Sequence, residues 1–361
     1  MPTDPDVPTR YIPGEGVEVT GEALWRAWID RVEPPVEQVT DGLWSIPVPM
    51  PDNPLRYVLV YALETVDGIV IVDAGWPTDE AWQGLVDGCR TAGFDVADVR
   101  GVLVTHIHPD HVGLASRVRE ASGAWIAMHP ADAALLHDRY GDIDDLMAAQ
   151  RELMAWSGIP EHELNQLSEA SVQLSDFISL REPDVLLEDG DTPDVPGWNL
   201  RAVWTPGHSP GHLCFHEPDR RWLFSGDHVL PRITPNISAH AQQTADPLTD
   251  YYRSLHKVRA LDTDEVFPAH EYRFRGLGAR VDHMIEHHEE RLDEIVVALE
   301  TSPGLTTWDL SRGLTWSRSW SEIPAHMRRA ANGETLAHLQ VLEHRSRVSR
   351  RHERPVRWFA D

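Results

Sequence analysis

The segment Thr105–His111 limits what this chain can fold into more than any other part of the sequence. It follows the apolar run Val102–Val104 and carries four residues of the kind that bind metals: His106, His108, Asp110 and His111. Burying such side chains at the end of a strand costs free energy unless they have partners, and a transition metal is a partner for both imidazole and carboxylate. The first two histidines lie on one side of an extended backbone, whereas the proline after them ends the strand and directs the last two residues toward a neighbouring position. The segment therefore predicts ligands for two metal ions.

A polar loop with accidental histidines is the alternative, since the chain contains 20 histidines. Three later segments argue against it, because in each an apolar strand ends in a ligand-type residue after a break. These residues are His208 after Leu200–Trp204, Asp227 after Trp222–Phe224, and His270 after Glu265–Phe267. Ligands drawn from the ends of several strands are typical of a metal site built on a layered α/β scaffold.

Other polar residues lie beside these candidates. Asp73 ends the predicted strand Gly68–Val72 and either caps the following helix or orients a metal-bound histidine. The remaining residues of this kind, interpreted as supporting or structural, are His212, Ser225 and His228. We expect His212 to form hydrogen bonds within its own loop.

The alternation of strands and helices divides the 361 residues into three parts. Residues 1–37 form an N-terminal extension, residues 38–300 one large catalytic domain, and residues 301–361 a small domain.

Residues 142–180 interrupt the alternation of strands and helices in the large domain with two or three helices. This insertion predicts a lid over a substrate pocket, with a packing appendage as the alternative. The residues expected to face either the body or an acyl pocket are Met147, Met154, Trp156 and Phe177. Farther on, His288 lies on the apolar face of a predicted helix and is interpreted as a core histidine. His283 and His287 are interpreted as solvent-facing.

The four ligand-type clusters, in this order, resemble the metallo-β-lactamase superfamily, and within it the dinuclear branch similar to glyoxalase II. The resemblance covers residues 38–300 and implies an α/β fold, a four-layer αββα sandwich with the site at one edge of its sheets. It also implies the ligand sets: His106, His108 and His208 for one metal, Asp110, His111 and His270 for the second, and Asp227 bridging the two. Nitrogen and oxygen ligands without thiolate favour two Zn²⁺ and also admit Fe or Mn. The antibiotic-hydrolysing enzymes have cysteine or serine at the position of Asp227, so β-lactamase activity is not expected.

The segment after Thr301 predicts two helices followed by two strands. Thr306–Asp309 is a capping-box pattern that begins the first helix, Glu334–His344 is the second, and strands are expected near Val348 and at Val356–Phe359. This outline resembles the winged-helix-like C-terminal domain of a subgroup that contains acyl-thioesterases and an endoribonuclease.

Charge and composition bound the partners. The net charge is −26, and residues 301–361 hold ten arginines against six acidic residues, a balance of +4, so residues 1–300 carry −30. An acidic body disfavours nucleic acid as a partner, and the C-terminal arginines are interpreted as a solvated face.

No apolar run is long enough to span a membrane, and no signal-peptide pattern is present. We therefore expect a cytoplasmic protein without a membrane partner, and the sequence leaves a homodimer open. Cys89 and Cys214 are expected to be small core residues rather than a disulfide.

The expected activity is hydrolysis. Two metals about 3.5–4 Å apart share a water, lower its pKa and present it as a bridging hydroxide to an electrophile. Asp110 and Asp227 are the expected catalytic residues, which orient the hydroxide and take its proton. The predicted substrate is a small or medium acyl compound, a thioester, ester or lactone. One alternative is an endonuclease or phosphodiesterase that acts on single-stranded RNA or DNA with the same metals, and another is a catalytically silent binding protein.

Overall fold

The structure is a computed structural model that describes residues 13–140, 143–164, 182–241, 246–351 and 353–361. Its contacts divide the chain into two compact units. The first comprises Met1–Leu136, Phe177–Pro235 and Leu255–His283, and the second comprises His137–Asp176, Asn236–Ser254 and Met284–Asp361. The division falls inside the helices α5 (Pro130–Tyr140), α8 (Pro247–Arg259) and α9 (Leu277–Thr301). The domain boundaries proposed from the sequence remain a prediction.

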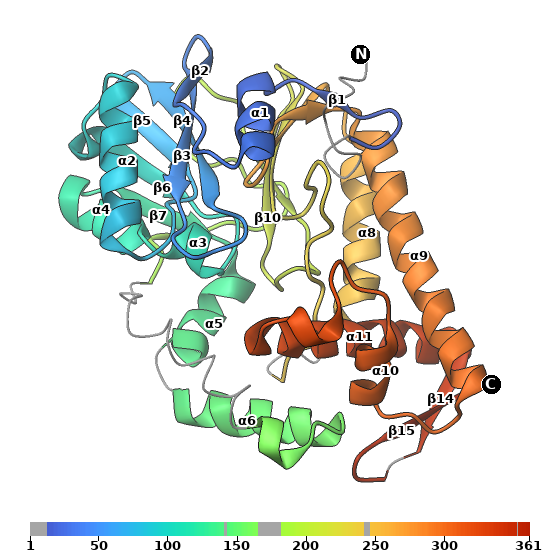
Figure 1. Cartoon of the computed structure of the whole chain (residues 1–361). Coiled ribbons are helices and arrows are strands. Elements are labelled where there is room, and N and C mark those ends of the chain that lie inside the picture. The colour runs from blue at the N-terminus through green and yellow to red at the C-terminus, as the bar shows by residue number, and fades with distance from the viewer. Residues whose placement is uncertain (1–12, 141–142, 165–181, 242–245, 352) are drawn as a thin grey trace. The chain divides into compact units, whose positions relative to one another are not determined.

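The first unit contains two mixed sheets (Figure 1). In spatial order, the seven-stranded sheet consists of β2 (Glu37–Thr40), β3 (Leu43–Pro49), β4 (Tyr57–Thr65), β5 (Gly68–Val72), β6 (Val99–Leu103), β7 (Trp125–Met128) and β8 (Val185–Leu186). The six-stranded sheet consists of β1 (Glu18–Val19), β13 (Phe274–Arg275), β12 (Glu265–Pro268), β11 (Trp222–Gly226), β10 (Leu213–Glu217) and β9 (Arg201–Trp204). The fold is the αββα sandwich predicted from the sequence.

The two sheets are joined by an apolar core. Residues 57–63 of β4 are buried without interruption, the pattern of a strand covered on both faces. Tyr61 of β4 packs edge-on against Phe224 and Phe267 of the other sheet, with ring centroids 5.4 and 5.5 Å apart, and its hydroxyl donates to the carbonyl of Pro268 at 2.9 Å. Aromatic pairs of this geometry add about 0.5–1.5 kcal/mol to the free energy of unfolding beyond the area they bury. The sheets are therefore fixed face to face.

Helices cover the outer face of the seven-stranded sheet in the first unit. These are α2 (Asp79–Thr91), the 3₁₀ turn η2 (Val96–Asp98) and α4 (Ala115–Ser122), while α1 (Glu22–Asp30) precedes β2 and α3 (Pro109–Val112) follows β6 (Figure 1). Helix α2 begins with Thr78, whose side chain accepts a hydrogen bond from the Ala81 N–H, so Asp73 is not its cap. Cys89 and Cys214 are free and buried, as predicted. Among the described residues, no helix is both long and apolar enough to cross a bilayer.

Parallel strand pairs in both sheets decide where polar strand ends meet. Strands β5 and β6 run parallel, and so do β11 and β12. The carboxyl ends of parallel neighbours lie at the same edge of a sheet. The residues that follow these four strands, which include most of the predicted ligands, are therefore brought to one edge of each sheet.

The second unit contains the insertion and the C-terminal segment. Its elements are α6 (Ile143–Trp156), part of α9, α10 (Thr307–Gly313), η4 (Trp320–Glu322), α11 (Ala325–His344) and the antiparallel pair β14 (Val348–Arg351) and β15 (Arg357–Ala360). The predicted order of two helices and two strands is confirmed, and Thr306 and Asp309 form the predicted capping box. Helix α11 begins at Ala325 rather than at the predicted Glu334. Asn332 and Gly333 are poor helix formers, and because they lie in the interior of the helix, the sequence pattern indicated too late a start. The winged-helix assignment remains a prediction.

The insertion packs on the C-terminal segment within this unit. Met154 shares a buried cluster with Ile159, Leu164 and Trp308, and the Trp156 ring lies edge-on to Trp358 at 6.4 Å. Met147 is half-buried, and Phe177 lies outside the described residues. Packing therefore accounts for Met154 and Trp156, and the lid over a substrate pocket remains a prediction.

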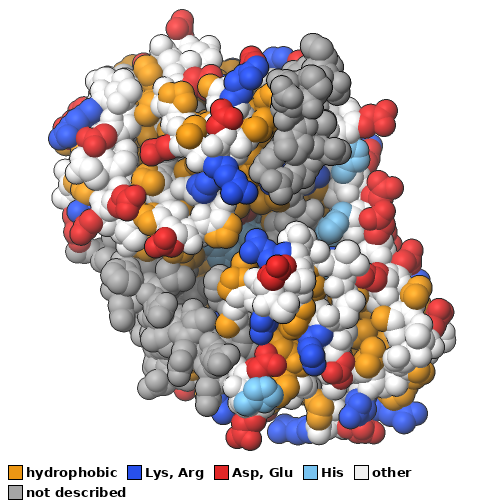
Figure 2. Space-filling view, viewed as in Figure 1, with side chains coloured by type: hydrophobic (Ala, Val, Ile, Leu, Met, Phe, Trp, Pro, Cys, Tyr) orange, Lys and Arg blue, Asp and Glu red, His pale blue; other side chains and the backbone are white. Residues whose placement is uncertain are grey.

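The C-terminal arginines are paired with carboxylates of the same unit. The pairs are Arg345–Glu289 (2.8 Å), Arg347–Asp293 (2.9 Å), Arg350–Glu343 (3.1 Å), Arg354–Glu152 (3.4 Å) and Arg357–Glu353 (3.7 Å). The Arg351 guanidinium lies 4.4 Å from the ring centroid of Phe359. Basic and acidic side chains are interspersed over the described part of the visible face (Figure 2). Three of these carboxylates, Glu152, Glu289 and Asp293, lie outside residues 301–361 and offset most of the +4 balance of that segment.

A buried polar cluster joins α9 to α11. His338 Nδ1 donates to the carbonyl of Glu334 at 2.7 Å, so its Nε2 accepts from Nδ1 of His288 at 3.1 Å. Burial lowers the pKa of His288 well below its usual value and that of His338 to about 3, so both are neutral. His288 is the core histidine predicted from the sequence, whereas His283 and His287 are half-buried rather than solvent-facing.

Replacing Glu334 should change how stability depends on pH. Burial raises the pKa of Glu334 from 4.5 to about 7; Arg291 of α9 opposes the shift, as does the Asn236 Nδ2 donor at 2.8 Å. Because the folded state holds this proton more tightly than the unfolded state, the stabilisation is complete below about pH 4.5 and is lost as pH rises through about 7. Glu334→Gln should therefore raise the melting temperature relative to wild type more at pH 8 than at pH 5. Thermal denaturation at both pH values measures this, with Glu343→Gln on the same helix as control, and an equal effect at both pH values would contradict it.

Candidate metal centre

Seven predicted ligands lie in the first unit, at or just beyond the ends of strands. His106 and His108 lie in the loop after β6, and Asp110 and His111 lie in α3. His208 follows β9, Asp227 follows β11 and His270 follows β12. All are buried except His108, which is half-buried. The structure thus brings together every residue that the sequence proposed as a ligand.

Their donor atoms fall into clusters of the size that one ion requires. Three groups have donor atoms within 4.8 Å of one another: His106, His108 and His208; Asp110, His111 and His270; and His106, His111 and Asp227. The first two groups coincide with the two ligand sets that the family resemblance implied. The third includes Asp227 and one histidine from each set, which is where a bridging residue has to lie.

The separations between donor atoms fit ligands that share an ion. His270 Nε2 lies 3.3 Å from both Asp110 Oδ2 and Asp227 Oδ1, whereas His106 Nε2 and His108 Nδ1, 2.9 Å apart, are at hydrogen-bond distance. Asp227 Oδ2 lies 3.5 Å from His208 Nε2 and 3.6 Å from His111 Nε2. Ligands at about 2.0–2.2 Å from a tetrahedral Zn²⁺ are about 3.3–3.6 Å from each other. Asp227 Oδ1 therefore faces the second ligand set, and Oδ2 lies between the two sets.

Unpartnered buried atoms test whether these residues fit a metal. His111 Nε2, His270 Nε2 and Asp227 Oδ1 are buried and have no hydrogen-bond partner among the described residues. Leaving such atoms unsatisfied costs about 1–3 kcal/mol each, and more for a charged group. All three face the cluster of candidate ligands, so a divalent cation bound among them would satisfy them. The residues present fit two metal positions.

Asp73 orients two of the imidazoles. Its Oδ2 accepts the Nδ1–H of His111 at 2.8 Å, which leaves His111 Nε2 as the free donor. Its carboxylate also accepts the Thr105 hydroxyl at 2.9 Å, so the Thr105 oxygen accepts from His106 Nδ1 at 3.0 Å and the lone pair of His106 is on Nε2, which faces His108. The backbone of Asp73 has φ 62°, a left-handed conformation uncommon for a non-glycine residue. Of the two roles considered from the sequence, orientation of histidines is the one that the structure supports.

Two further contacts hold the remaining ligands. His270 Nδ1 donates to the carbonyl of Tyr57 at 3.0 Å, which leaves its Nε2 for the cluster. His212 Nε2 accepts the backbone N–H of Asp227 at 3.2 Å, so its proton is on Nδ1 and is donated to Thr205 at 2.8 Å. The bond to Thr205 confirms the prediction that His212 forms hydrogen bonds within its loop, and the bond to Asp227 adds a contact not anticipated. Ser225 donates to Val229, a structural role.

The charges of the cluster act on each other. Burial lowers the pKa of His106 well below its usual value, and His111 lowers it further. Burial also acts against a charged His111, yet the carboxylates of Asp110, Asp73 and Asp227 raise the pKa of His111 well above its usual value. Burial acts to raise the pKa values of Asp110 and Asp227, but the neighbouring imidazoles outweigh it, and both pKa values lie below the usual value. Buried carboxylates held ionised in this way favour a cation among them.

Comparison with known proteins identifies the family. A model of the metallo-beta-lactamase superfamily matches residues 53–270. The chain belongs to the metallo-β-lactamase superfamily. It is 26% identical to the probable metallo-hydrolase YqjP of Bacillus subtilis over 311 residues, which are 84% of this chain and 93% of that protein. A shorter match, 30% identical over 112 residues, covers 31% of this chain and 33% of an atrochrysone carboxyl ACP thioesterase from Aspergillus fumigatus.

Solved structures of this superfamily share the fold. The metallo-beta-lactamase family protein TTHA1429 of Thermus thermophilus superposes with a TM-score of 0.78 and 29% identity, covering 90% of this chain and all of that one. A beta-lactamase domain protein from Burkholderia ambifaria gives 0.77 and 29%, covering 90% of this chain and 94% of that one. The shared fold therefore extends beyond residues 53–270 to 90% of this chain.

Sequence reasoning missed one residue of this metallo-β-lactamase-fold centre. The Asp132 carboxylate is buried and accepts hydrogen bonds from Ile107, Ser209 and Gly211, which lie in the loops that carry three of the candidate ligands. Asp132 lies in the first turn of α5, where an aspartate ordinarily only offsets the helix dipole. Nothing in the local pattern distinguishes it from such a residue, because its partners are distant in sequence.

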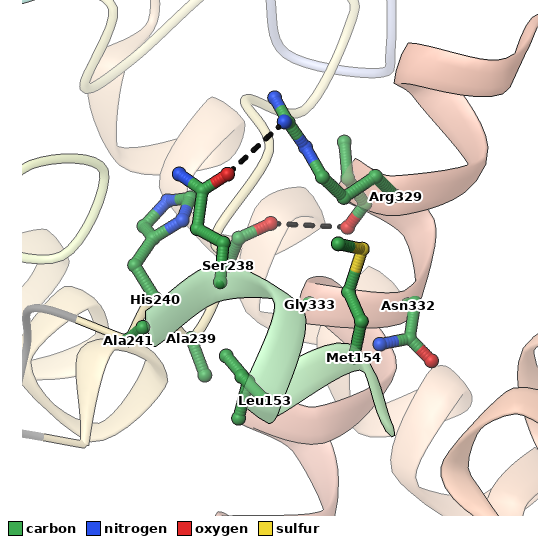
Figure 3. Close-up of a pocket in the computed structure, with 11 residues that line it drawn as sticks. Leu153, Met154, Ser238, Ala239, His240, Ala241, Arg329, Asn332 and Gly333 are labelled. Carbon is green, nitrogen blue, oxygen red and sulfur yellow. Dashed lines mark hydrogen bonds between the residues drawn. The ribbon is translucent and has the colours of Figure 1, made fainter. Parts of the chain in front are cut away.

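The second unit contains a cavity of about 100 Å³ (Figure 3). It is lined by Leu153 and Met154 of α6, Ser238 and Ala239, and Arg329 and Asn332 of α11. Arg329 contacts Gln150 Oε1 at 3.3 Å, and Ser238 Oγ donates to the Ala330 carbonyl at 3.0 Å. An engineered cavity of about 150 Å³ holds a benzene ring, so this one fits only a smaller group. That Met154 faces an acyl pocket remains a prediction.

Removing the Asp73 carboxylate should weaken metal binding. Asp73→Ala leaves the Nδ1 atoms of His111 and His106 without the group that fixes their protonation, so both rings lose orientation. Loss of such a supporting residue typically costs about 10–100-fold in metal affinity. Titration of metal-free protein with Zn²⁺ against a chelating dye measures the change. Asp79→Ala, which removes an exposed aspartate paired with Arg117, is the control, and equal affinities in the two variants would contradict the assigned role.

Proposed function

We propose that this protein is a dinuclear metal-dependent hydrolase that acts on a small or medium acyl substrate, a thioester, ester or lactone. The observation that carries the proposal is the pair of donor groups on either side of Asp227, in which three buried donor atoms have no other partner among the described residues. Superfamily membership supports hydrolysis as the reaction class.

Each residue has a defined task in this proposal. His106, His108 and His208 hold one ion, Asp110, His111 and His270 hold the other, and Asp227 contacts both. Bound divalent cations would supply a water activated near neutral pH and would polarise the scissile bond.

The two aspartates are the proposed catalytic residues. The side chains of Asp110 and Asp227 are each 10% exposed, whereas those of His111 and His270 are fully buried. The carboxylates thus have access to substrate and to the attacking water. As hydrogen-bond acceptors they orient that water and take its proton when it attacks the carbonyl carbon. The chain needs no nucleophilic side chain for this reaction.

An acyl substrate is favoured over a nucleic acid by the charges on the protein. A phosphodiester polymer requires basic side chains along its path, and phosphate contacts supply most of the affinity of nucleic-acid binding proteins. Five C-terminal arginines are already paired with carboxylates, and residues 1–300 carry −30. The local match to an ACP thioesterase is consistent with a thioester, and Zn²⁺ is the proposed metal.

Hydrolysis assays with chelator-treated and metal-reconstituted protein test the proposal. We expect turnover of at least one acyl thioester, ester or lactone in a panel of chain lengths, lost after chelation and restored by Zn²⁺. Single-stranded RNA and a β-lactam serve as negative substrates. Metal-dependent RNA cleavage without any acyl turnover would instead support the nuclease, and no metal-dependent turnover of any substrate would support a binding protein.

Replacing Asp227 should be far more damaging than replacing its neighbour His212. Asp227→Ala removes the carboxylate that lies beside histidines of both donor groups, so kcat/KM should fall by more than about 100-fold, whereas loss of a supporting residue such as His212 costs about tenfold. Steady-state kinetics on the best acyl substrate measure both variants, and circular dichroism confirms that each is folded. Equal losses in two folded variants would show that the ligand set is misassigned.

Removing C-terminal arginines should leave acyl hydrolysis nearly unchanged. Arg347, Arg350 and Arg351 contact other side chains of the second unit. Replacing all three with alanine should therefore change neither the metal ligands nor the binding of an acyl substrate. We expect kcat/KM within about twofold of wild type, and little change between 50 and 200 mM salt, a range over which phosphate-dependent binding falls steeply. A steep fall with salt in wild type, abolished in the triple variant, would indicate a polyanionic substrate.

A further inference from the structure

Asp132 connects two loops of the first unit that are distant in sequence. Its Oδ2 accepts the backbone N–H of Ile107 at 2.9 Å and the hydroxyl of Ser209 at 2.7 Å. Its Oδ1 accepts the N–H of Gly211 at 2.6 Å. The carboxylate is fully buried, so all three bonds form away from competing water.

The residues bonded to Asp132 lie next to the ligands of one metal position. Ile107 lies between His106 and His108, and Ser209 directly follows His208. Those three histidines are one complete donor group, whose atoms lie within 4.8 Å of one another. These three bonds of Asp132 thus all reach the loops that carry the His106, His108 and His208 group.

The loop around residue 211 is fitted to this carboxylate. A Cβ on Gly211 would lie 2.5 Å from the Asp132 nitrogen and 2.7 Å from its Cβ and Cγ, closer than side-chain atoms approach. The loop therefore reaches Asp132 only because residue 211 is glycine. This close approach and the three hydrogen bonds fix the distance between the loops of His106–His108 and His208.

We propose that Asp132 is a positioning residue that holds the His106, His108 and His208 group in its ligand geometry and so sets the affinity of that metal position without touching the metal. The inference rests on the proposed dinuclear function. Loops held only by their own backbone would have to be ordered by the metal, whereas loops bonded to one buried carboxylate are ordered beforehand, and this lowers the cost of binding.

Stepwise Co²⁺ titration of the full chain tests the proposal, because visible absorption reports each bound ion separately from turnover. Asp132→Asn keeps the shape of the side chain but places an amide N–H₂ against N–H donors. We expect the dissociation constant of one of the two Co²⁺ equivalents to rise about 10–100-fold while the other stays within about twofold. Ser209→Ala, which removes a single bond at 2.7 Å, should weaken the same equivalent by a smaller factor and also serves if Asp132→Asn does not fold.

A matched control is available in the same unit. Glu217 is a buried carboxylate that accepts the Asn199 N–H at 2.6 Å and pairs with Arg220 at 3.4 Å. Glu217→Gln should leave both Co²⁺ equivalents unchanged. Two equivalents of wild-type affinity in folded Asp132→Asn, or an equal weakening of both, would overturn the positioning role. Fewer than two equivalents in wild-type protein would overturn the proposed dinuclear function instead.

Discussion

The burial of five imidazoles and two carboxylates at the edge of a double sheet is the constraint on which the rest of this structure depends. Groups of this kind are stable inside a protein only when each polar atom has a partner. Here the chain itself provides partners for the ring nitrogens that face away from the cluster. His111 bonds to Asp73, His106 to Thr105, and His270 to the Tyr57 carbonyl. The inward-facing atoms remain as a preorganised donor set. The fold thus fixes the direction in which these three imidazoles offer their lone pairs.

Topology explains why such a set can be assembled from four separate segments. A parallel pair in each sheet places the ends of β5, β6, β11 and β12 at one edge, and the aromatic contacts of Tyr61 fix the two sheets face to face. Each ligand therefore lies within a few residues of a strand end or in the short helix α3. The loop of His208 is tied back through Asp132.

Much of this could be predicted from the sequence because its signals are local. The strand Gly68–Val72 is found as predicted, those predicted at Trp222–Phe224 and Glu265–Phe267 each extend by one or two residues, and all seven ligand candidates lie in one cluster. Strand β10 was missed because His216 and Glu217, both buried, break its apolar pattern after a loop rich in proline and glycine. The roles of Asp132 and of the Met154 cluster could not be predicted, since they depend on contacts between residues far apart in the chain. Likewise, no local pattern indicates that the insertion and the C-terminal segment share one compact unit.

Anomalous X-ray diffraction from crystals of Zn²⁺-loaded protein, recorded at the zinc edge, tests the central claim most directly. The account predicts two peaks about 3.5–4 Å apart. One should lie within about 2.0–2.2 Å of donor atoms of His106, His108 and His208, the other at the same distance from Asp110, His111 and His270, with Asp227 contacting both. A single peak at full occupancy, or two peaks away from these residues, would contradict it.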